Sequence, residues 1–289
     1  MTPHLIFGTA SFGMDLTDFQ DPESVKNLLQ TLQELGIRRL DSGARYPPLN
    51  PGRAEQLIGE TKELSGSFVV DTKIYTNTQN DGSGDLRPEA IDKSVNASLQ
   101  RLKRPEGWGV SNMSPEMLEK MLHLCEQHGW QKPSCYQGDY NLVTRGMETK
   151  LLPILRAHGM SFNAFRPLAA GFLTGKLVNN QHANTRFGDD HPLGKAAQKL
   201  FGAEDLHSAM KKFDADVKAT GLTPMEVAIR WIAHHSALKD EDGIVIGASK
   251  AEQIRETVTM IRKGPLPAEV LEMTEELWNA VKKTRGGII

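Results

Sequence analysis

The sequence is poor in cysteine and has no long apolar run. Cys125 and Cys135 are its only cysteines, too few for a disulfide framework. No stretch reaches the ~18 apolar residues that a membrane span requires. The N-terminal residues Met1 to Ala10 lack the basic and apolar regions of a secretory signal. These absences predict a soluble cytoplasmic protein with no membrane partner.

An excess of one charge is also missing. The 34 lysine and arginine residues nearly balance 36 aspartate and glutamate residues, and the formal net charge is −2. Such a balance gives no electrostatic reason to expect a nucleic-acid partner. The length alone suggests about two domains, but α/β barrels of ~250 residues form one domain and the chain contains no Pro/Gly/Ser-rich linker. We therefore predict a single domain over residues 1–289, with monomer and homodimer both open.

Short apolar runs alternate with amphipathic segments, a pattern typical of βα units around a parallel sheet. The sequence predicts an α/β barrel of the (β/α)8 TIM-barrel type with one βα unit deleted, because seven strands are recognisable. A polar segment from Val178 to Leu206 predicts a long surface loop. The predicted strands are Leu5–Thr9, Arg38–Ser42, Phe68–Lys73, Trp108–Asn112, Ser134–Tyr140, Phe162–Pro167 and Gly243–Ser249. The predicted helices include Ser24–Leu35, Ala54–Leu64, Pro88–Lys103, Pro115–His128, Glu148–His158 and Ala251–Lys263.

Polar residues mark the ends of six predicted strands. In a parallel α/β barrel, the carboxyl ends of the strands carry the chemistry. Helix capping or a turn would explain any one of these residues, but their recurrence from strand to strand favours a functional site. The set comprises Asp41, Lys73, Ser111, Asn112, Gln137, Asn141, Arg166, Gly247 and Ser249.

Three residues near these ends have the chemistry of a proton donor and its support. Reduction of a carbonyl group by hydride requires a proton for the developing alkoxide. A tyrosine, with an ordinary pKa of about 10, can supply it when a neighbouring cation lowers its pKa and a carboxylate holds that cation. Tyr46, Lys73 and Asp41 are candidates for these three roles. The alternative is that Tyr46 covers the barrel rim and Lys73 is a solvated lysine.

These residues carry a resemblance to the aldo-keto reductases, in particular to the aflatoxin-aldehyde-reductase branch and its fungal members. Residues 41–46 resemble the D-T-A-x-x-Y signature, with Ser-Gly in place of Thr-Ala. Thr72 and Lys73 resemble the T-K of the third strand, and residues 109–112 resemble a G-[VL]-S-N strand. The resemblance covers nearly the whole chain. A G-x-G-x-x-G fingerprint is absent, as in this family, which does not use a Rossmann fold.

The resemblance implies a function and three catalytic residues. It implies reduction of a small-molecule aldehyde or ketone to an alcohol with NADPH, with Tyr46, Lys73 and Asp41 as the catalytic residues. Fungal members often belong to secondary-metabolite pathways, and the resemblance permits that place for this chain.

The resemblance also implies where the nicotinamide end of the cofactor binds. Ser111, Asn112 and Gln137 match positions that hold the carboxamide, and Phe165 matches an aromatic position near the ring. Arg166, which replaces a frequent asparagine or serine, begins a segment that covers the cofactor. The other implied contacts are Pro167, Leu168, Gly171 and Lys176 in this segment, and Arg186 in a loop that reaches the pyrophosphate or ribose.

The last strand and helix resemble the site for the adenosine 2′-phosphate. A serine hydroxyl, a lysine and backbone N–H groups converge there at a helix N-terminus, which favours an anion. Lys250 beside Ser249 predicts NADPH rather than NADH. The implied adenosine contacts are Gly247, Ser249, Lys250, Gln253, Glu256 and Thr257, although the family usually has asparagine at the last position.

The histidine that the family places at the end of its fourth strand, in an H-x-P-like motif, is missing. Residues 97–110 run from the third long helix into the next family strand across a handful of residues, so about 30 residues, one strand and one helix, are absent. The barrel must then close with seven strands or leave a gap near residues 104–108. Four other histidines, His123, His128, His234 and His235, are predicted to be structural.

Several alternatives stay open. General acid–base groups contribute typically 10²–10⁴-fold each, so loss of the histidine predicts impaired turnover with cofactor binding retained. The intact Tyr46 set favours an enzyme, whereas the missing segment favours a non-catalytic NADP(H)-binding protein or scaffold. A gene model with a skipped exon is a third origin, and an unrelated barrel lyase or isomerase would not bind NADPH.

No metal-ligand spacing or G-x-S-x-G elbow occurs, and residues 282–285 predict a solvated helix end.

Overall fold

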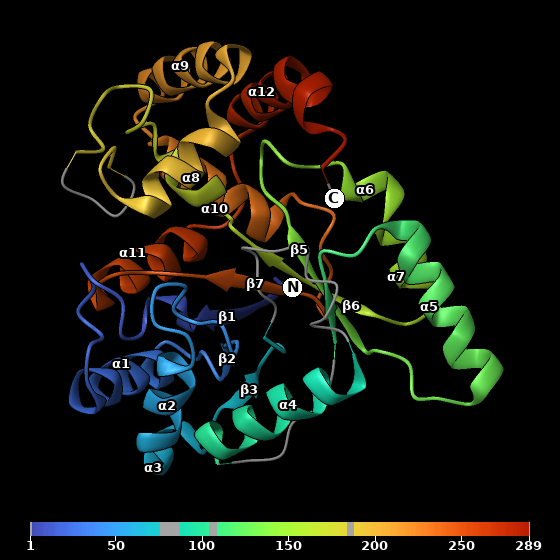
Figure 1. The fold of residues 1–289 in the computed structure, drawn as a ribbon. Coiled ribbons are helices and arrows are strands. Elements are labelled where there is room, and N and C mark those ends of the chain that lie inside the picture. Colours follow the sequence, from blue (N-terminus) through green and yellow to red (C-terminus); the bar gives the residue numbers. More distant parts are fainter. Residues whose placement is uncertain (1, 76–86, 104–108, 184–187, 289) are drawn as a thin grey trace. The chain divides into compact units, whose positions relative to one another are not determined.

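The computed structural model describes residues 2–75, 87–103, 109–183 and 188–288. Seven strands and their helices form an α/β fold of the TIM-barrel type, which confirms the predicted fold class (Figure 1). The chain divides into two compact units. The first unit comprises Met1–His4, Gly109–Ile244 and Thr257–Ile289, and the second comprises Leu5–Trp108 and Val245–Glu256. A single domain over the whole chain remains a prediction.

All seven predicted strands are present, most with shorter bounds. They are β1 His4–Gly8, β2 Arg39–Asp41, β3 Val69–Asp71, β4 Val110–Ser111, β5 Cys135–Asp139, β6 Ser161–Phe165 and β7 Gly243–Ile246. Their order is β3-β2-β1-β7-β6-β5-β4. The pairs β1–β2, β2–β3, β4–β5, β5–β6 and β6–β7 are parallel. β3 and β4 are the ends of this order, and the predicted closure near residues 104–108 lies outside the described residues.

Four complete helices and a short 3₁₀ helix lie in the described residues of the second unit. They are η1 Thr9–Ser11, α1 Pro22–Glu34, α2 Arg53–Glu60, α3 Lys62–Ser65 and α4 Pro88–Leu102. Asp21 and Ser24 cap α1 reciprocally, so the helix begins just before its predicted start. The predicted helix over residues 54–64 is interrupted at Thr61, whose Oγ1 donates to the carbonyl of Leu57 at 2.8 Å. α1, α2 and α3 lie against one another (Figure 1).

The described part of the first unit contains the remaining helices. They are α5 Pro115–His128, α6 Met147–Lys150, α7 Leu152–Ala157, η2 Ala169–Thr174, α8 Pro192–Phe201, α9 Glu204–Ala219, α10 Pro224–His234 and α12 Ala268–Arg285; α11, Ala251–Arg262, begins in the second unit and ends in the first. Tyr140 contacts Phe162 and Trp231 edge-on. α9 and α12 lie side by side (Figure 1). None of the helices in the described residues is long and apolar enough to cross a membrane.

The predicted surface loop from Val178 to Leu206 is wrong for its second half. Residues 192–201 form α8, which His191 caps through its Nδ1 and Pro192 begins. Phe201 at its end is 1% exposed and stacks on Phe172 with ring centroids 5.4 Å apart. A tertiary contact of an aromatic side chain therefore stabilises a helix in a segment whose polar composition suggests a loop.

The two helices α2 and α4 contact each other closely at Gly59. A Cβ atom built on Gly59 would overlap the carbonyl oxygen of Arg101, in the last turn of α4. Glycine at this position therefore allows the backbones of the two helices to approach each other.

We expect Gly59→Ala to lower the free energy of unfolding by about 1–3 kcal/mol, because α2 and α4 would have to separate. Urea unfolding followed by circular dichroism measures this difference. Gly287→Ala is the control, since its Cβ would meet no atom within 4 Å. Equal losses of stability in the two variants would contradict the close contact.

Candidate active site

The proposed proton-donor residues lie together in the second unit. Lys73 Nζ donates to Asp41 Oδ1 at 2.6 Å and to the carbonyl oxygen of Ser42 at 2.7 Å. The same nitrogen lies 5.1 Å from the centroid of the Tyr46 ring. Asp41 is 3% exposed. The three side chains thus form one cluster at the ends of β2 and β3, and their catalytic roles remain proposals.

Backbone hydrogen bonds order the chain that follows β2 and β3, where Lys73 and Tyr46 lie. Ala44 N–H donates to the carbonyl of Lys73 at 2.9 Å, which continues the β2–β3 ladder past both strands. Tyr46 N–H donates to the carbonyl of Gly43 at 2.8 Å and so closes a turn. Tyr46 is half-buried, and its peptide bond to Pro47 is cis. The turn places the phenol next to the lysine that extends β3.

Electrostatics keep Lys73 charged. Burial alone would lower the pKa of Lys73, but the carboxylate of Asp41, followed by Tyr46 and Asp71, outweighs burial and raises its pKa above the ordinary value. Lys73 is therefore an ammonium at neutral pH. A cation beside a phenol stabilises the phenolate form electrostatically, which is the property that a tyrosine proton donor requires.

A second cluster of the same unit lies between β7 and α11. The backbone N–H of Ser249, its hydroxyl and the backbone N–H of Lys250 all donate to Gln253 Oε1, at 2.8, 3.1 and 3.1 Å. Three donors at the beginning of a helix converge on one oxygen atom, as they would on a phosphate oxygen. The side chains of Lys250 and Glu256 are exposed beside it. The donor set fits the predicted adenosine phosphate site.

The predicted carboxamide residues lie together in the first unit. Ser111 of β4 is in register with Gln137 of β5. Asn112 donates from Nδ2 to Ser111 Oγ at 2.8 Å, and its backbone N–H donates to the carbonyl of Gln137 at 3.4 Å. Asn112 has a φ of +53°, a left-handed conformation that asparagine tolerates better than most residues. The three polar side chains therefore come from two adjacent strands, with Ser111 at the end of β4, Asn112 directly after it and Gln137 in the middle of β5.

Arg166 has a partner that the sequence analysis missed. Its Nη1 lies 3.0 Å from Oδ2 of Asp139, and its guanidinium lies 5.1 Å from the ring of Phe165. Asn141 donates from Nδ2 to Asp139 Oδ1 at 2.8 Å and to the carbonyl of Arg166 at 3.0 Å. Burial raises the pKa of Asp139, and the charge of Arg166 opposes that rise. The sequence signal was an acid two residues after Gln137, on the same strand face.

The prediction of a solvated C-terminal helix end is wrong for Arg285. This residue is 3% exposed, and burial lowers its pKa. Its Nη2 donates to Thr144 Oγ1 at 2.7 Å, its Nη1 donates to the carbonyl of Leu200 at 3.1 Å, and its guanidinium lies 4.5 Å from the ring of Phe201. The last turn of α12 therefore packs into the first unit, where backbone carbonyls and an aromatic ring compensate the buried charge.

The remaining predicted residues are placed as follows. Pro167 is buried, Leu168 and Gly171 are half-buried, and Lys176 is exposed. Arg186 lies outside the described residues. Gly247 is exposed in the second unit, and Thr257 is half-buried in the first.

The four histidines named in the sequence analysis lie on α5 and at the end of α10. His123 and His128 are exposed on α5. His234 Nε2 lies 2.8 Å from the carbonyl of Ile261, and His235 Nε2 accepts from the N–H of Leu266 at 2.8 Å. Both contacts are structural, because they tie the end of α10 to the end of α11 and the segment after it.

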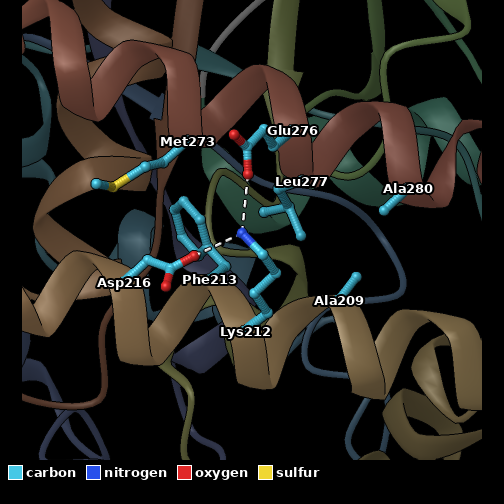
Figure 2. Close-up of a pocket in the computed structure, with 8 residues that line it drawn as sticks. All are labelled: Ala209, Lys212, Phe213, Asp216, Met273, Glu276, Leu277 and Ala280. Atoms are coloured by element: carbon cyan, nitrogen blue, oxygen red, sulfur yellow. Dashed lines mark hydrogen bonds and ion pairs between the residues drawn. The ribbon is translucent and has the colours of Figure 1, made fainter.

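A surface hollow lies apart from all these residues. Figure 2 shows it between α9 and α12, where Lys212 bridges Asp216 at 2.7 Å and Glu276 at 2.8 Å. Its lining residues are Ala209, Lys212, Phe213, Asp216, Met273, Glu276, Leu277 and Ala280. None of them belongs to the predicted site. Lys212 pairs with two carboxylates across the helix interface, so the hollow is a feature of helix packing.

Known proteins are similar to the chain over most of its length. An aldo-keto reductase of Pseudocercospora fijiensis is 34% identical over 81% of this chain and 77% of its own. Oxidoreductase sirO of Leptosphaeria maculans is 29% identical over 97% of this chain and 95% of its own. Aflatoxin B1 aldehyde reductase member 2 of Rattus norvegicus is 28% identical over 97% of this chain and 86% of its own.

The same similarity reveals a gap. The alignment with sirO runs over 317 positions while the whole chain has 289 residues, so at least 28 positions (317 − 289) have no residue here. The model of the aldo/keto reductase family matches residues 4–107 and 106–279 as two segments. They meet where the sequence analysis places the missing strand and helix. The two matches together cover nearly the whole chain, and the protein belongs to the aldo/keto reductase family of oxidoreductases.

Proposed function

We propose that this chain reduces an aldehyde or ketone to an alcohol with NADPH and that Tyr46 donates the proton. The observation that carries the proposal is the position of the Lys73 ammonium, 2.6 Å from Asp41 and 5.1 Å from the Tyr46 ring. Membership of the aldo/keto reductase family supports the reaction class. The name of the rat relative supports an aldehyde as the substrate. A place in secondary metabolism is part of the proposal and rests on the resemblance to fungal members of the family.

Each residue of the cluster has one role in this reaction. NADPH, when bound, supplies the hydride that adds to the carbonyl carbon. Tyr46 Oη holds the proton that passes to the carbonyl oxygen as charge develops there. Lys73 stabilises the phenolate that remains, and Asp41 holds Lys73 in place. Solvent then returns a proton to Tyr46, so that one hydride and one proton are consumed for each alcohol formed.

We assign the cofactor contacts unit by unit. In the second unit, the donors of Ser249 and Lys250 would hold the 2′-phosphate, with Gly247, Gln253 and Glu256 beside them. In the first unit, Ser111, Asn112 and Gln137 would hold the carboxamide. The remaining assigned contacts are Phe165, Arg166, Pro167, Leu168, Gly171, Lys176, Arg186 and Thr257.

One observation favours a second function, a non-catalytic NADP(H)-binding protein. The two family-model matches meet at residues 106–107, where the resemblance implies that the segment with the family's histidine is missing. Loss of one acid–base group lowers a rate typically by 10²–10⁴-fold. A slow reductase that still binds its cofactor is therefore the physical expectation, and a protein with binding alone is the alternative.

We expect Tyr46→Phe to lower kcat by about 10²-fold or more with 4-nitrobenzaldehyde, because the proton donor is lost. The measurement is the loss of NADPH absorbance at high enzyme concentration, beside the NADPH Kd from fluorescence titration, which should stay within about twofold. Tight NADPH binding by the unaltered chain without turnover would establish the non-catalytic alternative. Equal kcat values for the unaltered chain and Tyr46→Phe would exclude Tyr46 as the proton donor.

We expect Lys250→Ala to raise the Kd for NADPH about tenfold and to leave the Kd for NADH unchanged, because only NADPH carries the 2′-phosphate. Arg262→Ala, at the far end of the same helix, is the matched control for loss of one exposed cation. Isothermal titration of each variant with both cofactors measures the difference. An equal rise in the Kd of Lys250→Ala for NADPH and for NADH would show that Lys250 does not bind the 2′-phosphate.

A further inference from the structure

Glu55 is a buried acid outside the residues assigned above. It belongs to α2 and is 0% exposed. Its Oε2 accepts from Arg101 Nε at 2.7 Å and lies 2.6 Å from Arg101 Nη2. Its Oε1 accepts from Thr72 Oγ1 at 2.5 Å. One carboxylate thus joins the last turn of α4 to the residue directly before Lys73.

Thr72 and Lys73 follow the end of β3 in extended chain. Side chains alternate between the two sides of an extended segment, so Thr72 reaches Glu55 on one side while Lys73 reaches Asp41 on the other. Within the described residues, β3 pairs with β2 and is an end of the strand order. The bond from Thr72 to Glu55 therefore anchors a strand end that is paired along one edge.

The other end of this link is equally well defined. Arg101 also donates from Nη2 to Ser98 Oγ at 3.2 Å, and its side chain is 23% exposed. A hollow of about 390 Å³ separates α4 from the loop at Ala44 and Pro51, and Arg101 forms part of its wall. A second link from α4 reaches the chain beyond Lys73, because Tyr75 N–H donates to Ser94 Oγ at 2.7 Å. Glu55 is thus the side chain that joins α4 to Thr72, the residue before Lys73.

We propose that Glu55 is a positioning residue: by holding Thr72 and Arg101, it fixes the backbone from which Lys73 reaches Asp41 and Tyr46. This inference rests on the proposed function. Placement matters because a displacement of about 1 Å at a reacting group can cost 10²-fold in rate. The two family-model matches meet at residues 106–107, shortly after α4, so the link joins the last helix before that junction to the Lys73 cluster.

Thr72→Val tests the link with little change of shape, because it replaces the hydroxyl with a methyl group of similar size. We expect Thr72→Val and Glu55→Gln each to lower kcat about tenfold, with KM and the NADPH Kd within about twofold. Thr72→Ser, which keeps the hydroxyl, should restore most of the rate. The double variant should be no slower than Glu55→Gln alone, because both changes break one link.

Thr61→Val is the matched control. Thr61 is a fully buried threonine between α2 and α3, and its hydroxyl donates to the carbonyl of Leu57. Its loss should cost similar stability and leave kcat unchanged. A fall in kcat equal to that of Thr72→Val, or effects of Glu55→Gln and Thr72→Val that multiply in the double variant, would overturn the positioning role.

A second readout does not need turnover. The alkaline absorbance titration of the unaltered chain minus that of Tyr46→Phe isolates the ionisation of Tyr46. Thr72→Val should move this ionisation to higher pH by about one unit, because a displaced ammonium stabilises the phenolate less. If Thr72→Val shifts the ionisation of Tyr46 but the unaltered chain shows no turnover, the proposed function is wrong and the positioning role stands. If the unaltered chain turns over normally and Thr72→Val shows neither the shift of the Tyr46 ionisation nor the fall in kcat, the positioning role is wrong and the proposed function stands.

Discussion

The ion pair between Lys73 and Asp41 is the interaction on which the rest of the site depends. A carboxylate that is 3% exposed would be costly without a partner, and the lysine ammonium 2.6 Å away compensates it. The same ammonium lies over the ring of Tyr46. A single charge therefore compensates a buried acid and, in the proposed reaction, also stabilises the phenolate form of Tyr46.

The Lys73 cluster and the donors around Gln253 lie outside the segment that the resemblance implies is missing. The β2–β3 ladder, which continues to Ala44 and Lys73, holds the proton-donor cluster without any residue from the absent segment. The donors around Gln253 at the start of α11 are equally independent of it. In the proposed reaction, absence of the family's histidine would remove one contribution to the rate and would leave Tyr46 and the donors at Ser249 and Lys250 in place.

The strands and the Lys73 cluster could be predicted from the sequence because their signals are local. Apolar runs that end in a polar residue mark the strands, and residues 41–46 carry the motif of the donor. Long-range pairs carry no such signal. Glu55 and Arg101 are 46 residues apart on two amphipathic helices, and Asp139 and Arg166 are 27 apart.

Other misses have the same physical origin. α8 was missed because its stability comes from Phe201 packing on Phe172, which a polar composition conceals.

The most direct test of the account is mass spectrometry of the alcohol formed from 4-nitrobenzaldehyde with NADPH deuterated at both C4 positions. Hydride transfer from the bound cofactor should place a single deuterium on the carbinol carbon, in an amount that exceeds the enzyme. Unlabelled alcohol, or no alcohol despite saturable NADPH binding, would contradict the account.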